Sequence, residues 1–148
     1  MSISSLWPTV VHTTVLTGAD LTRVTTEPAR LPEVLPDAHP GRDLAWTWRT
    51  ERWEGGFHAG LRHSPGTWCA LLVIAARAAD QEDPSGALIL HDPRAGAANV
   101  GLPGLPWGRP LTLPTRPGLL AITPGWLPWQ IAPVRADDER TVLTAHTT

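Results

Sequence analysis

The chain has 148 residues, a formal net charge of −2 and an ordinary content of hydrophobic residues, 42%. Its length suits one domain that buries a core without metal or disulfide support, and the single cysteine, Cys69, excludes an internal disulfide. The charge argues against a nucleic-acid or anionic-membrane binder, no apolar run is long enough to span a bilayer, and the absence of lysine excludes Schiff-base chemistry.

The first part of the chain predicts one strand and a weakly helical segment. Sixteen prolines and thirteen glycines divide the sequence into short pieces, which favours many short strands over long helices. Residues 7–16 are rich in Val and Thr and are expected to form the first strand. Residues 20–35 have the best helical pattern, but Pro28 and Pro32 interrupt it, so we expect only short helical turns there.

Two further strands are predicted in the middle of the chain. Residues 44–48 alternate in polarity, with Leu44, Trp46 and Trp48 on one face, which indicates a half-buried strand. Residues 68–76 form a continuous apolar run that fits either a buried strand or a helix. The turn sequences SPG before this run and DPSG after it favour the strand.

The remaining predicted strands are short and are separated by turns rich in Gly and Pro. A long loop is expected over residues 95–110. The strands are expected at residues 87–92, 111–113, 119–123, 126–134 and 140–146. This gives roughly eight or nine strands, enough for a sandwich or jelly roll, and residues 1–148 are expected to form a single domain.

Four segments, taken in order, resemble a family of small bacterial 2-oxoglutarate–iron(II) oxygenases built on a double-stranded β-helix. These segments are GGFHAGLRH at residues 55–63, GALILHDPR at 86–94, RPGLLAITPGWL at 116–127 and ER at 139–140. The resemblance covers the chain from about residue 44 onward and implies an all-β, cupin-like jelly roll. Short helical turns are expected to precede it.

The resemblance also implies a metal site, and the sequence departs from it. The family holds iron(II) with a His-x-Asp/His pair and a distal histidine, a facial set that leaves positions open for 2-oxoglutarate and oxygen. Aligned on the motifs, Leu61 stands at the first position, His63 at the second, and Trp129 at the distal one. The arginine that pairs with the co-substrate is matched by Arg140, whereas Val142 replaces a serine. One of three ligands is therefore retained, and no metal is expected.

A pocket lined by tryptophan is predicted in place of the iron site. Alternation along the last strand puts Arg140, Val142, Thr144 and His146 on one face. His63, His146 and Arg140 are the predicted catalytic residues. The predicted substrate-binding residues are Trp48, Leu61, Trp68, Trp126, Trp129, Gln130 and Val142.

The favoured hypothesis is a metal-independent cyclase or isomerase of natural-product biosynthesis, without a cofactor, that acts on an apolar or aromatic small molecule. One alternative is a variant oxygenase that uses iron(II) and 2-oxoglutarate. The other is a non-catalytic protein that binds an apolar or aromatic ligand. We expect a cytoplasmic protein, because the N-terminal residues have no signal-peptide pattern. The net charge predicts no nucleic-acid or membrane partner, and a homodimer is left open.

Overall fold

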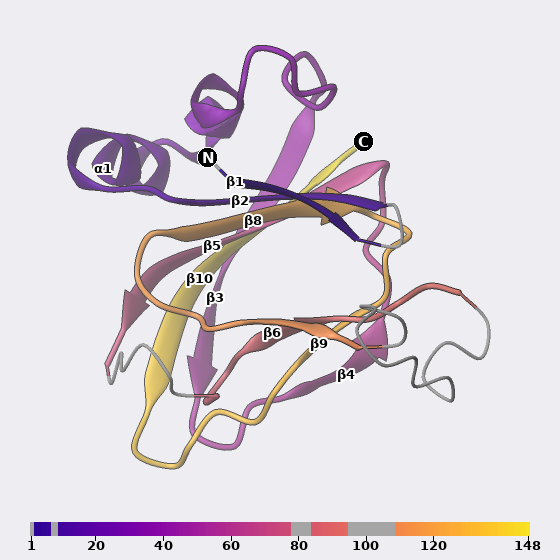
Figure 1. Cartoon of the computed structure of the whole chain (residues 1–148). Coiled ribbons are helices and arrows are strands. Elements are labelled where there is room, and N and C mark those ends of the chain that lie inside the picture. The colour runs from indigo at the N-terminus through magenta and orange to yellow at the C-terminus, as the bar shows by residue number, and fades with distance from the viewer. Residues whose placement is uncertain (1, 7–8, 78–83, 95–108) are drawn as a thin grey trace.

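The computed structural model describes residues 2–6, 9–77, 84–94 and 109–148 (Figure 1). The described residues form ten strands, one α-helix and one 3-10 helix. In chain order these are β1 (Ser2–Leu6), β2 (Thr9–Val15), α1 (Gly18–Thr26), η1 (Pro28–Val34), β3 (Trp46–Glu54), β4 (Ala59–Arg62), β5 (Trp68–Ala76), β6 (Leu88–Leu90), β7 (Leu111–Leu113), β8 (Leu119–Pro124), β9 (Trp129–Ile131) and β10 (Glu139–Thr147). Neither helix has the length and apolar character needed to cross a bilayer.

The strands form two antiparallel sheets that face each other (Figure 1). The larger sheet has six strands in the order β1-β2-β8-β5-β10-β3, and the smaller has four in the order β4-β9-β6-β7. The helices α1 and η1 cover the outer face of the larger sheet (Figure 1). The molecule therefore has three layers: helices, large sheet and small sheet.

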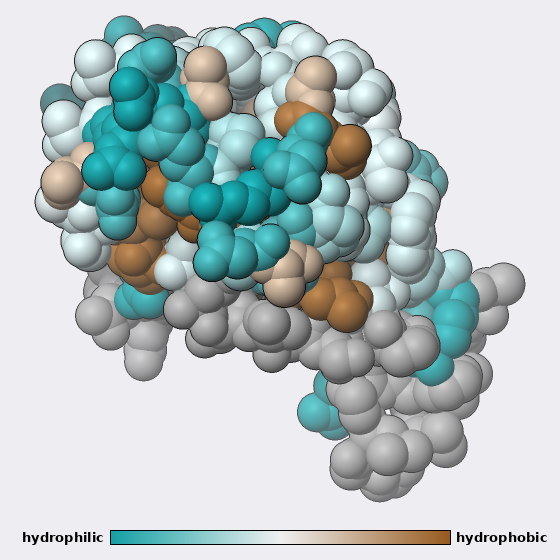
Figure 2. Space-filling model, turned by 90° about the horizontal axis from the view of Figure 1, so that it is seen from above, coloured by the Kyte–Doolittle hydropathy of each residue, from teal (hydrophilic) through white to brown (hydrophobic). Residues whose placement is uncertain are grey.

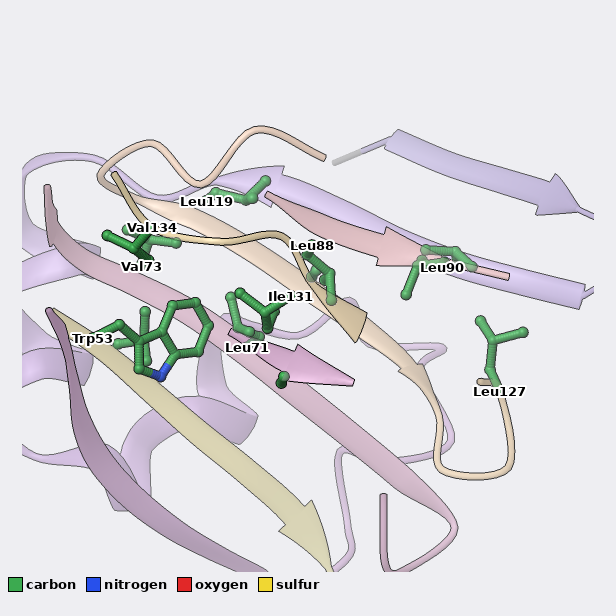
Figure 3. Packing of buried hydrophobic residues seen from close by; sticks show 13 residues of the cluster. Trp53, Leu71, Val73, Leu88, Leu90, Leu119, Leu127, Ile131 and Val134 are labelled. Carbon is green, nitrogen blue, oxygen red and sulfur yellow. The ribbon is translucent and has the colours of Figure 1, made fainter. Parts of the chain in front are cut away.

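Each face of the large sheet has its own hydrophobic core. Trp53, Leu71, Val73 and Ile131 belong to the core between the two sheets (Figure 3). Leu72, Leu120, Leu143 and other outward residues pack against Val24 of α1 and Leu31 of η1. The helices are amphipathic, so their outer surface is mostly hydrophilic, with separate hydrophobic spots (Figure 2).

Most predicted elements are present, and the differences have physical reasons. The apolar run at β5 is a strand, because core residues cover it on both faces and leave no reason for polar alternation. Residues 20–35 form α1 and η1, and Pro32 lies inside the short 3-10 helix, as the predicted helical turns require. Strands β1 and β4 were not predicted, because they are short and have no apolar alternation. The expected loop at 95–110 lies almost entirely outside the described residues.

The face predicted for residues 44–48 is only partly buried. Trp46 packs in the outer core and donates its indole N–H to the carbonyl of Gly41 at 2.8 Å. Leu44 and Trp48 stay 38% and 40% exposed and belong to neither hydrophobic core. Alternation thus predicted a strand that overlaps only the beginning of β3, since Leu44 lies before the strand and β3 continues to Glu54, and it overestimated how far the predicted face is covered.

Candidate active-site pocket

A pocket of about 570 Å³ opens between the two sheets. Its size is typical of sites for small organic molecules. The apolar part of its wall comes from both sheets and includes Leu71, Leu88, Leu90, Ala121 and Trp129. The polar lining residues are Thr47, Arg49, Glu51, Arg62, His63, Ser64, Cys69, Thr123, Thr144 and His146.

Small and polar side chains on the inner face of the large sheet make room for this pocket. Strand pairing puts His146, Cys69 and Thr123 side by side on β10, β5 and β8. Larger aliphatic residues, such as Val73, fill the inner face further along the same strands. The space between the sheets is therefore hollow at one end and packed at the other.

Glu51 organises the polar wall that β3 contributes. Its carboxylate accepts hydrogen bonds from Trp53 Nε1 at 3.0 Å, Thr144 Oγ1 at 3.1 Å and the guanidinium of Arg49 at 2.5 and 3.0 Å. Partial burial raises the pKa of Glu51, but the hydrogen bonds from Trp53, Arg49 and Thr144 outweigh it, so the pKa is lowered overall. Glu51 is thus an anion that already has partners, and it neutralises Arg49.

Arg62 is the other guanidinium on the pocket wall, and its surroundings differ from those of Arg49. Its Cζ lies 4.7 Å from the centre of the Trp129 ring, a cation–π geometry. No carboxylate within 4 Å pairs with it among the described residues. A hydrogen bond from Trp129 Nε1 to Ser64 Oγ at 2.8 Å also fixes the orientation of the ring. This end of the pocket therefore combines a flat apolar surface with an excess of positive charge.

The pocket also contains one thiol and two imidazoles. Cys69 Sγ lies 3.0 Å from Thr123 Oγ1, and burial raises the pKa of the thiol despite hydrogen bonds that lower it. A neutral thiol is a poor nucleophile, so Cys69 is not a candidate for nucleophilic catalysis. His63 comes from the connection between β4 and β5, and His146 from β10. Imidazole is the side chain that enzymes use most often as a general acid or base, so these two residues are the candidates for proton transfer on this wall.

Comparison with solved structures identifies the architecture. The fold is similar to a prolyl-4-hydroxylase from Pseudomonas putida, with a TM-score of 0.59 and 14% identity over 93% of this chain and 87% of that one. It is also similar to a 2OG-Fe(II) oxygenase family oxidoreductase from Burkholderia pseudomallei, with a TM-score of 0.53 and 16% identity over 97% and 70% of the two chains.

A prolyl 4-hydroxylase from Phytophthora capsici gives a TM-score of 0.54 with 19% identity, over 92% of this chain and 46% of that one. No protein-family model and no curated protein matches the sequence. The chain has the double-stranded β-helix fold of the 2-oxoglutarate–iron(II) oxygenases. The fold expected from the four sequence segments is therefore confirmed.

Some predicted site residues of this oxygenase-like barrel lie together on the pocket wall. These are His63 and His146, predicted as catalytic, and Trp129, predicted as substrate-binding. Trp48, also predicted as substrate-binding, borders the pocket although it lies on the same face of the edge strand β3 as Trp46 and is 40% exposed. Trp129 is half-buried and lies at the position aligned with the distal histidine. The hypothesis that a tryptophan lines the pocket there is thus compatible with the structure.

Other predicted site residues lie outside the pocket. Leu61 and Trp126 are 62% and 55% exposed and lie at the surface. Trp68 packs in the outer core, and Val142 in the inner core. Gln130 is half-buried but does not line the pocket, because alternation on β9 turns Trp129 and Ile131 inward instead.

Arg140 also lies away from the pocket, in a buried polar network. Its side chain is 2% exposed and forms an ion pair with Asp138, whose side chain is fully buried. Arg140 Nε donates to Thr115 Oγ1 at 3.2 Å and Nη2 to the carbonyl of Ser85 at 3.3 Å. Ser85 Oγ in turn donates to Asp138 at 2.7 Å. Within this structure the guanidinium anchors the packed end of the barrel.

The side chains present do not match the donor set that holds iron(II) in this family. Across residues 9–77, 84–94 and 109–148, no group of three His, Cys, Asp or Glu side chains is arranged to bind a metal ion. An indole N–H is a donor only, so Trp129 cannot serve as a ligand at the distal position. Leu61 supplies no ligand atom either.

Sequence reasoning missed most of the polar residues that line the pocket, among them Arg49, Glu51, Arg62 and Thr123. A signal for the first two was present. Alternation that puts Trp46 and Trp48 on one face of β3 puts Thr47, Arg49, Glu51 and Trp53 on the other. For Arg62 and Thr123 no motif or spacing pointed to a site.

Proposed function

We propose that this protein is a small-molecule enzyme that uses the pocket between its sheets for a non-oxidative acid–base conversion, such as a cyclisation or isomerisation. The observation that carries the proposal is that His63 and His146, from separate elements, line one largely apolar pocket. Histidine gives and takes protons near neutral pH, and a positioned imidazole typically contributes a factor of about 10²–10⁴ to a rate.

The wall of the pocket indicates the kind of substrate. Trp129, Leu88 and Leu90 offer apolar surface to an aromatic or aliphatic body. Arg62 beside Trp129 offers a positive charge to an anionic group, whereas Arg49 is already neutralised by Glu51. We therefore propose an apolar or aromatic substrate that carries a carboxylate or a similar anion.

The donor set supports a reaction without iron and without 2-oxoglutarate. Trp129 uses its only polar hydrogen on Ser64, and the described part of the chain offers no three-ligand group. In this proposal Arg140 does not hold a co-substrate, since Asp138 is its partner. The second candidate is a variant iron/2-oxoglutarate oxygenase, which the fold alone favours.

A deuterium-exchange experiment tests the proposal. Phenylpyruvate, an enolisable aromatic carboxylate, serves as the probe, and incorporation of deuterium from D2O is followed by mass spectrometry. We expect exchange above the uncatalysed rate, and a decrease of about 10²-fold or more in His63→Gln and His146→Gln. His58→Gln is the matched control, because His58 is exposed and does not line the pocket.

Two results would contradict the proposal. If phenylpyruvate quenched the tryptophan fluorescence, which shows binding, but gained no deuterium, the protein would be a non-catalytic binding protein. Stoichiometric iron in the purified protein, together with succinate formed from 2-oxoglutarate, would establish the oxygenase instead.

A further inference from the structure

Among the strands that the structure describes, β3 lies at an edge of the large sheet, with β10 on one side only. The carbonyl oxygen of Arg49 lies 3.3 Å from Thr144 Oγ1, so this carbonyl points toward β10. Backbone groups alternate in direction along an antiparallel strand, so those of Trp48, Thr50 and Arg52 point to the open edge. No backbone hydrogen bond between described residues reaches them there.

The edge strand has nine residues, WTWRTERWE; Thr50 and its neighbour Arg49 are exposed, and its other neighbour, Glu51, is half-buried. Charged residues usually protect such an edge from pairing with another strand. On β3, however, the residues on the two sides of Thr50 complement each other. Arg49 precedes Thr50 and Glu51 follows it, while Trp48 and Arg52 stand one position further out. A second copy that runs antiparallel would therefore meet opposite charges.

We propose that β3 pairs with β3 of a second copy of this chain, antiparallel and with the two-fold axis at Thr50. Thr50 then faces the partner's Thr50, Arg49 faces the partner's Glu51, and Trp48 faces the partner's Arg52. Opposite charges and an arginine on an indole are both stabilising cross-strand pairs. The twelve strands of two large sheets form one continuous sheet in this dimer.

The charges also select this register over its neighbours. If one copy slipped by one residue, backbone groups of one β3 that point to the open edge would lie opposite backbone groups of the other β3 that point back toward its own β10. Only slips of two residues therefore keep the backbone hydrogen bonds between the two copies. A slip of two residues places Arg49 opposite the partner's Arg49, or Glu51 opposite the partner's Glu51. Like charges directly opposite each other are destabilising, so the register centred on Thr50 is preferred.

The pairing reaches the pocket, because Arg49 and Glu51 line it. Residues that face each other across antiparallel strands share one face of the sheet, so the partner's Arg49 lies beside the Glu51 of the first copy on the pocket side. The second copy thus contributes a charged residue to the margin of the site. This dimer does not depend on the reaction proposed above.

Charge reversal tests the proposal on the full chain by sedimentation equilibrium. We expect dimers from the unchanged protein and a rise of about tenfold or more in the dissociation constant for Arg49→Glu or Glu51→Arg alone. An equimolar mixture of the two variants should dimerise again, since each copy then presents the charges that the other lacks. A monomeric unchanged protein, or variants that remain dimeric alone, would overturn the proposal.

A cross-linking experiment keeps the test independent of how well these variants fold. Thr50→Cys should give a covalent dimer with a short bis-maleimide, because the axis brings the two copies of residue 50 together. Thr112→Cys, on the exposed face of β7, and the unchanged chain with its part-buried Cys69 are the controls. Equal cross-linking of Thr50→Cys and Thr112→Cys would also overturn the proposal.

Discussion

The two ends of the space between the sheets are built from the same strands but differ in whether their polar side chains line a cavity or are bonded to one another. At the hollow end His146 and Thr144 of β10 line the pocket. At the packed end Arg140 of the same strand is fully enclosed and bonded to Asp138, Thr115 and Ser85. A polar residue on the inner face of this barrel is therefore available to a ligand only where its neighbours leave space and do not already satisfy it.

The outer face of the large sheet gives a third environment for polar residues. His12 of β2 and His39 of the segment after η1 are buried, with their ring centres 4.5 Å apart, and both lie against Trp68. His39 Nδ1 accepts the backbone N–H of Gly41 at 2.9 Å. These imidazoles fix the segment after η1 on the sheet, whereas His63 and His146 line a cavity.

The largest effect is expected when the packed end loses its carboxylate. Asp138→Asn removes the buried carboxylate that forms an ion pair with the guanidinium of Arg140, which costs about 3–5 kcal/mol of unfolding free energy. Urea denaturation measures this loss. Arg52→Gln is the control: it breaks a solvent-screened surface pair with Glu139 and should change the free energy of unfolding far less.

This variant can also break the contrast between the two ends. If Asp138→Asn were nearly as stable as the unchanged protein and bound anionic ligands more tightly, Arg140 would be a ligand anchor. Both ends of the space would then belong to one site.

A smaller effect, on the outer face, is expected from pH. Burial and the neighbouring His12 lower the pKa of His39 from 6.5 to about 4, and burial also lowers the pKa of His12. Between these values the unfolded chain binds more protons than the folded one. Stability is therefore complete above about pH 6.5, and His39 alone should remove about 1–2 kcal/mol by pH 5.

Urea denaturation at pH 7, 6 and 5 measures this loss, and His39→Gln should flatten the dependence. His58→Gln should retain it, because His58 is exposed. An unchanged pH dependence in His39→Gln would show that acid acts elsewhere in the molecule.

The sequence predicted the barrel better than the site. Turn residues and β-branched runs locate strands such as β7 and β8, because these signals act locally. The alternation of side chains along a strand also predicted that Arg140 and His146 lie on the same face of β10. It could not show which of them reaches a cavity, because Asp138, Ser85 and Thr115 surround Arg140 only after distant segments meet.

The prediction for Leu61 illustrates a different limit. Motif alignment assigned it to the pocket, but the wall there is made by its neighbours Arg62 and His63. The pairing of β4 with β9 has an irregular register between Ala59 and Arg62, and a local irregularity of this kind changes which side chains face inward. A sequence motif alone does not specify such a shift.

The smallest effect is expected at the hollow end, from the arginine that stacks on Trp129. Arg62→Gln removes a positive charge from the pocket wall but keeps a polar side chain of moderate length. Because the site is open to solvent, we expect only a five- to tenfold weaker affinity for phenylpyruvate, about 1 kcal/mol. Quenching of tryptophan fluorescence measures this loss of affinity.

Two controls separate charge from shape at the hollow end. Phenylacetone, which has a ketone but no carboxylate, should bind both proteins equally, and Arg23→Gln on the helical layer should change neither affinity. Equal losses for both ligands would mean that Arg62 acts by holding the Trp129 ring in place, and the hollow end would then select its ligand by shape instead of charge.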